Sequence, residues 1–370
     1  MKVGIFLVSA QPPFLTQREV LANSLEYAEL AEELGFTNIW ILEHHFTPLS
    51  ICPSSIVMAA HVLGRTRRMR VGTAVSIVTL EHPIRLAEQV ALIDQLSEGR
   101  FDLGIGRGAG NKDFPVFGVD ASNNRRTMEE WVEIMRTAWT QERVEWSSDL
   151  ITFPKVPVYP QPWTSPHPPL YVACDSPTSV EYAARNGFPM LLSYWIQRET
   201  LAGNVELYRE VAEAHGQDPD PSRHVVSMIV HLEDTRQAAQ AAVYDNMLWW
   251  REAGSHAYFT YEELKSLTSY EHAFRRWEEG LLAAQTGTPT TVDDLGVQRL
   301  LDCNPVDTPE AVVARIQELR DEVGLEHFVC GFEASGNRDR IVDTMRRFAA
   351  EVMPELDLEP VAPAAPGARP

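Results

Sequence analysis

The stretch Arg70–Gly108, RVGTAVSIVTLEHPIRLAEQVALIDQLSEGRFDLGIGRG, decides the fold. Its first part, residues 70–78, is rich in β-branched side chains and predicts a strand. Pro83 suits the first turn of the helix that follows, and the apolar residues 101–105 predict a second strand. A helix between two apolar strands is typical of a βαβ unit with parallel strands.

The same alternation of apolar runs and helical stretches extends in both directions along the chain. It predicts an α/β protein, specifically a (β/α)8 TIM barrel with insertions after strands 4 and 7. An open doubly wound sheet is the alternative, but the first turn, residues 9–13, lacks the glycine fingerprint of a dinucleotide fold. The eight strands are expected at residues 2–8, 38–42, 70–78, 101–105, 170–174, 190–193, 225–232 and 327–332.

The two insertions and the end of the chain have their own sequence character. Seven prolines in residues 151–169 predict an irregular excursion, and residues 235–279 are expected to be mainly helical. Residues 1–353 are predicted to form a single barrel domain. The Pro- and Ala-rich tail, residues 354–370, is predicted to be disordered.

Charge and cysteine usage exclude several classes of function. The chain has 370 residues and a formal net charge of -20, so a nucleic acid or an anionic membrane is not an expected partner. We see no apolar stretch long enough to span a bilayer. The four cysteines lie far apart without CxxC spacing, which argues against a zinc site or a disulfide framework and fits a cytoplasmic protein.

Polar side chains follow several of the predicted strands. In a parallel barrel the loops at the carboxyl ends of the strands build the active site, so we expect these side chains to share one mouth. Any one of them has a plain structural reading, for example a satisfied histidine, a flexible glycine loop or a helix cap. The residues are Glu43, His44, His45, Arg107, Asp175, Ser176 and Glu333.

The chemistry of these residue types favours a phosphate-bearing cofactor beside a proton-handling histidine. Imidazole titrates near neutral pH and can move protons. Arg107 lies among glycines, where its guanidinium can pair with a phosphate, and Ser176 precedes a helix start, which attracts anions. The rival is a metallohydrolase, but the other histidines of the chain do not repeat the strand-end pattern well.

Several long segments resemble the bacterial luciferase alpha subunit and, more broadly, the luciferase-like flavin monooxygenases. They are MKVGIFLVSAQPPF, GFTNIWILEHHFT, the stretch from Val71 to Gly108, KDFPVFG, NPVDTPE and CGFEASG, and the resemblance runs from Met1 to about Pro354. It implies a (β/α)8 barrel that binds reduced FMN supplied by a separate flavin reductase. It also implies a dimer formed through the helices after strands two and three, which is a homodimer if no partner resembling the beta subunit exists.

The resemblance implies a reaction as well. Reduced FMN and dioxygen would form a 4a-hydroperoxyflavin that oxidises an apolar organic substrate such as an aldehyde or a ketone. A deazaflavin-dependent hydride-transfer oxidoreductase and a non-catalytic partner resembling the luciferase beta subunit are the alternatives. The closer match to the alpha subunit argues against the first, and retention of His44 and Arg107 argues against the second.

Family roles fall on named positions. The resemblance makes His44 the catalytic histidine near the flavin ring and His45 the histidine beside it. Asp175 stands where the luciferase alpha chain has glutamate, and Ala74–Val75 falls where the family often has a non-proline cis peptide below the flavin. The region that would hold the FMN phosphate contains Arg107, Arg125, Ser176, Thr178 and Ser179.

Two departures from luciferase bear on the reaction. Gly106 occupies the position of a reactive cysteine, and its smaller size is expected to leave space beside the flavin ring. Residues 249–301 differ from luciferase in the region of its lid, so we expect oxidation with little or no light. The aromatic residues of this region either line an apolar substrate pocket or belong to the core, and they are Trp249, Trp250, Tyr258, Phe259 and Tyr261.

Overall fold

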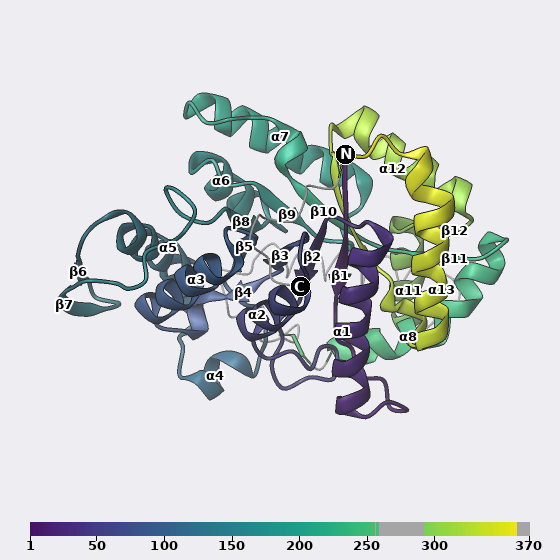
Figure 1. Cartoon of the computed structure of the whole chain (residues 1–370), viewed down its shortest axis with the longest axis horizontal. Helices are drawn as coiled ribbons and strands as arrows, with labels where there is room; N and C mark the ends of the chain where they lie inside the picture. Colours follow the sequence, from purple (N-terminus) through teal and green to yellow (C-terminus); the bar gives the residue numbers. More distant parts are fainter. Residues whose placement is uncertain (256, 259–291, 361–370) are drawn as a thin grey trace.

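Eight parallel strands close into a barrel within the part of the chain that the computed structural model describes, residues 1–255, 257, 258 and 292–360 (Figure 1). Each strand pairs with its two neighbours, and the last pairs with the first. This confirms the predicted (β/α)8 TIM barrel. In order around the barrel the strands are β1 (Lys2–Leu7), β2 (Asn38–Ile41), β3 (Arg70–Thr73), β5 (Phe101–Gly106), β8 (Leu170–Ala173), β9 (Met190–Leu192), β10 (Val225–Ile229) and β13 (His327–Gly331).

Helices surround the strands, and local signals in the sequence set their ends (Figure 1). Thr16 and Glu19 form a capping box at the start of the first helix, which Gly35 ends in the left-handed conformation with a φ of 90°. Pro83 is the first residue of its helix, as predicted. The helices are α1 (Gln17–Leu34), α2 (Ser55–Arg65), α3 (Pro83–Ser97), α5 (Asn124–Thr140), α6 (Pro177–Arg185), α7 (Arg198–Ala214), α8 (Arg236–Ser255), α11 (Val292–Cys303), α12 (Pro309–Val323) and α13 (Arg338–Arg347).

The predicted third and seventh strands are each interrupted. The peptide bond Ala74–Val75 is cis, as the family resemblance implied, and it separates β3 from the short strand β4 (Ser76–Ile77). β4 then pairs with the end of β5. The seventh strand ends at Ile229, and β11 (His231–Leu232) pairs with β12 (Val306–Asp307) outside the barrel. The chain therefore changes direction at the rim, where the sequence predicted continuous strands.

The insertion after the fourth barrel strand is more regular than predicted. It contains α4 (Asp113–Phe117), α5 and an antiparallel hairpin of β6 (Val144–Ser147) and β7 (Thr152–Val156), which projects from the barrel in Figure 1. The prediction of an irregular segment at residues 151–169 is thus wrong for β7. Cross-strand pairing of Trp146 with Phe153 stabilises the hairpin despite Pro154. Of the helical stretch predicted at 235–279, α8 is present and residues 259–279 lie outside the described residues. Helix α11 was not predicted.

A close contact between β3 and β5 fixes the strand ends next to the cis peptide. The Thr73 hydroxyl donates to the Gly104 carbonyl at 2.7 Å and accepts from the Gly104 N–H at 3.0 Å. A Cβ on Gly104 would lie 1.9 Å from the Thr73 carbonyl oxygen, so only glycine fits here. Because Ala74–Val75 and Gly106–Arg107 follow these two residues, the contact brings two expected site segments side by side.

The two ends of the described chain meet at the start of the first strand. The Met1 amino group donates to the Asp357 carbonyl at 2.6 Å, and the Glu359 N–H donates to the Met1 carbonyl at 2.9 Å. Residues 354–360 therefore contact the barrel. They were predicted to belong to a disordered tail. Residues 361–370 of that tail lie outside the described residues.

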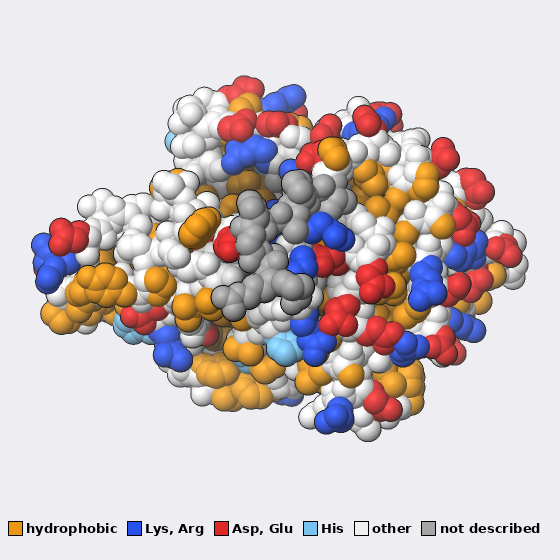
Figure 2. Space-filling view, viewed as in Figure 1, with side chains coloured by type: hydrophobic (Ala, Val, Ile, Leu, Met, Phe, Trp, Pro, Cys, Tyr) orange, Lys and Arg blue, Asp and Glu red, His pale blue; other side chains and the backbone are white. Residues whose placement is uncertain are grey.

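The surface carries both charge signs, with acidic groups in excess over the whole chain. Apolar side chains gather where Figure 1 places α4, and three exposed residues there are Phe46, Val116 and Phe117 (Figure 2). None of the helices within the described ranges combines the length and the apolar character needed to cross a membrane.

Candidate active site

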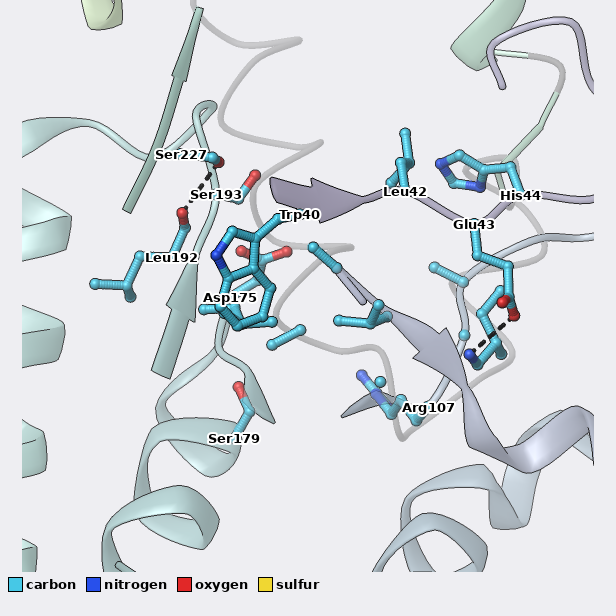
Figure 3. A pocket seen from close by; sticks show the side chains of 18 of the residues that line it. Trp40, Leu42, Glu43, His44, Arg107, Asp175, Ser179, Leu192, Ser193 and Ser227 are labelled. Atoms are coloured by element: carbon cyan, nitrogen blue, oxygen red, sulfur yellow. Dashed lines mark hydrogen bonds between the residues drawn. The ribbon is translucent and has the colours of Figure 1, made fainter. Parts of the chain in front are cut away.

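A cavity of about 310 Å³ opens at the carboxyl ends of the barrel strands (Figure 3). Most of the predicted site residues lie together here, as expected for residues at the carboxyl ends of parallel strands. Figure 3 shows Asp175 and Ser179 on one side of the cavity and Arg107 and His44 on the other. The predicted site residues that line it are His44, Ala74, Val75, Gly106, Arg107, Arg125, Asp175, Ser176 and Ser179.

Two guanidinium groups and a helix start supply the positive part of the lining. Arg107 follows β5, and Arg125 lies in the first turn of α5. Arg107 donates to Asn124 Oδ1 at 3.4 Å, which restrains its side chain beside the α5 start. Ser176 is the N-cap of α6 and forms a reciprocal capping box with Ser179. Helix N-termini and arginines both favour anions, so these groups fit a phosphate.

His44 lies in the cavity as a neutral imidazole. Burial lowers its pKa to about 4, the neighbouring Glu43 opposes that change, and His45 adds to it. Its backbone N–H donates to the Cys52 carbonyl at 3.1 Å, which fixes the chain just after β2. Near neutral pH the ring therefore carries one N–H and one lone pair, and it can both donate and accept a proton.

Glu43 holds this strand end in place, a role that the sequence did not predict. One carboxylate oxygen accepts from the Ser55 N–H at 2.8 Å and from the Ser55 hydroxyl at 2.6 Å. The other accepts from the Ile77 N–H at 3.0 Å. The carboxylate thus joins the end of β2 to the start of α2 and to β4. A glutamate directly after a buried strand was the signal, but its partners are distant in sequence.

Three predicted residues lie away from the cavity lining. The His45 ring packs edge to face on Phe117 with centroids 4.9 Å apart, close to the exposed apolar side chains of α4. Thr178 is exposed, and its hydroxyl lies 3.2 Å from that of Ser176. The prediction that Glu333 lies at the mouth of the barrel is wrong. Its buried carboxylate accepts hydrogen bonds from the backbone N–H groups that follow β1, those of Val8, Ser9 and Ala10.

The space expected beside Gly106 is already filled. A Cβ on Gly106 would lie 2.6 Å from Cγ2 of Val75, so the valine side chain takes the volume that a larger residue at 106 would need. The expectation from sequence was wrong because it considered one position alone. The β3–β5 contact and the turn at Ala74–Val75 place the two residues against each other.

The two alternatives for the aromatic residues of the 249–301 region divide between residues. Of the aromatic residues named there, Tyr258 lines the cavity, Trp250 is buried against the core, and Phe259 and Tyr261 lie outside the described residues. Trp249 packs partly buried against the same core. The aromatic side chains that line the cavity come mainly from strands and strand ends, and they are Phe6, Trp40, Tyr194, Trp195 and Tyr258.

The cavity therefore suits a cofactor with an anionic group and a large apolar ring. Most of the remaining lining is aliphatic and aromatic. Its other polar groups are the carboxyl groups of Glu43, Asp113 and Asp175 and the hydroxyls of serines and tyrosines, which are Ser176, Ser179, Ser193, Ser227, Tyr194 and Tyr258. Among the residues that the structure describes, no three His, Cys, Asp or Glu side chains are grouped to hold a metal ion.

A family model described as luciferase-like monooxygenase matches residues 1–327. The chain belongs to this family. Members are flavin-dependent monooxygenases, which makes the protein an enzyme of that class. The alkanal monooxygenase alpha chain of Photorhabdus luminescens is 35% identical over 356 residues, with 96% of this chain and 97% of the relative covered. The alkanal monooxygenase beta chain of Vibrio harveyi is 30% identical over 290 residues, or 77% of this chain and 88% of the relative.

Solved structures share the barrel over nearly the whole chain. The monooxygenase RslO1 from Streptomyces bottropensis has a TM-score of 0.76 and 28% identity, and the match covers 96% of this chain and 99% of the other. The oxygenating constituent of 3,6-diketocamphane monooxygenase from Pseudomonas putida, a type II Baeyer-Villiger monooxygenase solved with FMN, also has a TM-score of 0.76. It is 21% identical, with 97% and 99% of the two chains covered.

The packing of Val75 against Gly106 gives a stability prediction for this luciferase-like protein. Gly106→Cys alone forces Val75 to move, and overpacking of this kind typically costs about 1–3 kcal/mol. Val75→Ala alone leaves a void and also destabilises. Combined, the two changes should restore most of the loss, so urea unfolding of the single and double variants should give a favourable coupling energy. Purely additive losses would show that the two side chains do not compete for one volume.

Proposed function

We propose that the protein is a two-component FMN-dependent monooxygenase that takes reduced FMN from a separate flavin reductase. One oxygen atom of dioxygen enters an apolar aldehyde or ketone, and the other leaves as water. The observation that carries this proposal is a single cavity in which Arg107, Arg125 and the α6 start lie with the neutral His44 and an apolar lining.

The positive groups would hold the phosphate of FMN. Arg107 and Arg125 provide charge-assisted hydrogen bonds, and the positive end of the α6 dipole lies behind the Ser176 cap. Bound reduced FMN supplies the two electrons that activate dioxygen. The aliphatic and aromatic lining excludes water from that chemistry.

His44 would handle the proton of the oxygen step. As a neutral imidazole inside the cavity it can accept a proton at one nitrogen while it donates from the other. Glu43 positions the backbone beside it through Ser55 and Ile77. The presence of His44 and Arg107 in one cavity supports a catalytic chain over a beta-like partner.

The class of substrate rests on the lining and on the relatives. The relatives are named as an alkanal monooxygenase and a Baeyer-Villiger monooxygenase, and both names describe oxidation of a carbonyl compound. A cavity whose lining is mainly apolar suits an apolar carbonyl substrate. The four cysteines have no disulfide partner, which supports a cytoplasmic location.

The first test is product analysis with reduced FMN, dioxygen and candidate carbonyl substrates, with decanal as the initial probe. We expect decanoic acid or, from ketones, esters that carry one labelled oxygen from ¹⁸O₂. We expect little or no light, because Val75 beside Gly106 replaces the cysteine surroundings that the luciferase resemblance implies. Products without ¹⁸O would contradict the monooxygenase reaction, and emission per flavin comparable with a luciferase would contradict the dark one.

The second test concerns the phosphate. Arg107→Ala should weaken binding of reduced FMN by about ten- to a hundredfold, since a charge-assisted hydrogen bond is worth about 1.5–3 kcal/mol. Arg126→Ala is the matched control, because Arg126 lies on the same helix as Arg125 but is exposed and pairs with Asp149. Anaerobic titration measures both affinities. Equal affinities for the two variants would remove Arg107 from the site.

The third test separates the neighbouring histidines. His44→Ala should slow the oxidation step by about 10²- to 10⁴-fold with little change in FMN affinity, as expected for loss of an acid–base group. His45→Ala should have a smaller effect, because its ring packs on Phe117 instead of lining the cavity. Rapid mixing of the reduced complex with dioxygen, followed by flavin absorbance and product quench, measures the step. An unaltered rate in His44→Ala would refute its role.

We also propose a homodimer through α2 and α3, as the family resemblance implied. These adjacent helices expose apolar side chains to solvent, with Val57 68%, Leu92 47% and Leu96 76% exposed. Leu96→Glu should convert a dimer to a monomer in light-scattering chromatography, because it places a charge in an apolar interface. Val116→Glu on α4 is the control, at a similarly exposed apolar position. Parent protein that elutes as a monomer would overturn the proposal.

A further inference from the structure

Tyr258 reaches the cavity from the segment after α8, and the proposed chemistry gives it no role so far. Its hydroxyl lies 3.0 Å from Nε2 of His44. The two rings also meet edge to face, with centroids 5.5 Å apart and an interplanar angle of 80°. Both side chains line the cavity. Tyr258 therefore contacts the one imidazole that the proposed function uses.

Backbone contacts hold Tyr258 at this position. Its N–H donates to the Gly254 carbonyl at 3.3 Å, and the neighbouring Ala257 carbonyl accepts from the Asn111 N–H at 3.1 Å. Gly110 and Tyr258 form an antiparallel bridge. The residues after α8 are thus joined to the glycine loop after β5, and the phenol is fixed relative to the loop that carries Arg107.

The direction of the hydrogen bond follows from the state of each partner. Burial raises the pKa of Tyr258, and the carboxylates of Asp175 and Asp113 add to this, so the phenol keeps its proton. His44 is neutral and has one nitrogen that can accept. A phenol O–H is a much more acidic donor than a neutral imidazole N–H. The hydroxyl is therefore the donor and Nε2 the acceptor.

We propose that Tyr258 is a positioning residue for His44, whose hydroxyl donates to Nε2 and so keeps the single N–H of the imidazole on Nδ1. The hydrogen bond made by one ring nitrogen sets the tautomer and the ring orientation of a histidine. In this tautomer Nε2 accepts from the Tyr258 hydroxyl, and the proton that His44 can donate is on Nδ1. The tautomer does not depend on the proposed function, but its effect on oxidation does.

The other groups that face this pair come from several elements. From the end of β2, Glu43 raises the pKa of His44 and His45 lowers it. Asp113 of α4 and Asp175 after β8 act on Tyr258, and the two cavity arginines, Arg107 and Arg125, share the lining. Tyr258→Phe alters none of these charges and keeps the ring, so its effect on His44 isolates the hydroxyl.

The test is ¹⁵N NMR of protein labelled at histidine, with the His44 signals assigned by their loss in His44→Gln. We expect the parent protein to show the Nδ1–H tautomer and Tyr258→Phe to show a mixture. We also expect the His44 pKa in Tyr258→Phe to rise by about one unit, because a hydrogen bond that stabilises the neutral ring is lost. Tyr208→Phe is the control, since its buried hydroxyl lies outside the cavity and has no partner in the described structure.

Kinetics complete the test. Tyr258→Phe should slow the oxidation step by about tenfold with FMN affinity unaltered, and Tyr208→Phe should change neither. An Nε2–H tautomer in the parent, or a tautomer and pKa in Tyr258→Phe identical to the parent, would overturn the proposal. A changed tautomer with an unaltered oxidation rate would confirm the assignment of Tyr258 and instead overturn the role of His44 under the proposed function.

Discussion

The contact of Thr73 with Gly104 is the constraint on which the site depends. The Thr73 hydroxyl donates one hydrogen bond to the Gly104 backbone and accepts another from it. The two strands then lie so close together that no Cβ fits at position 104. Beyond this contact one strand turns through the cis peptide Ala74–Val75, and the other continues into the glycine loop that carries Arg107. One strand pairing thereby sets both the cavity wall at Val75 and the position of the loop that carries Arg107.

One part of the cavity carries positive charge, and another part favours an uncharged imidazole. The chain has a formal net charge of -20, yet Arg107, Arg125 and a helix start contribute positive potential to the lining. Around His44, burial favours the neutral ring. An anionic group and an uncharged imidazole can therefore lie in the same cavity.

Residues that support the site act through neighbours that are distant in sequence. Glu43 joins the end of β2 to Ser55 and Ile77, and Tyr258 joins His44 to the loop after β5. The pairing of Val75 with Gly106 follows the same rule, because a glycine that looks empty in sequence is filled from the adjacent strand. The consequences of a substitution at such positions depend on the pair and not on either residue alone.

The sequence by itself determined the barrel, the helix start at Pro83 and the meeting of most predicted site residues in one cavity, because hydrophobic periodicity, helix-start residues and position at a strand end are local or topological signals. It misjudged Glu333 and the space beside Gly106, and it missed the hairpin of β6 and β7. Only the tertiary structure decided these, since each depends on which atoms of distant segments occupy the same volume and complete each other's hydrogen bonds.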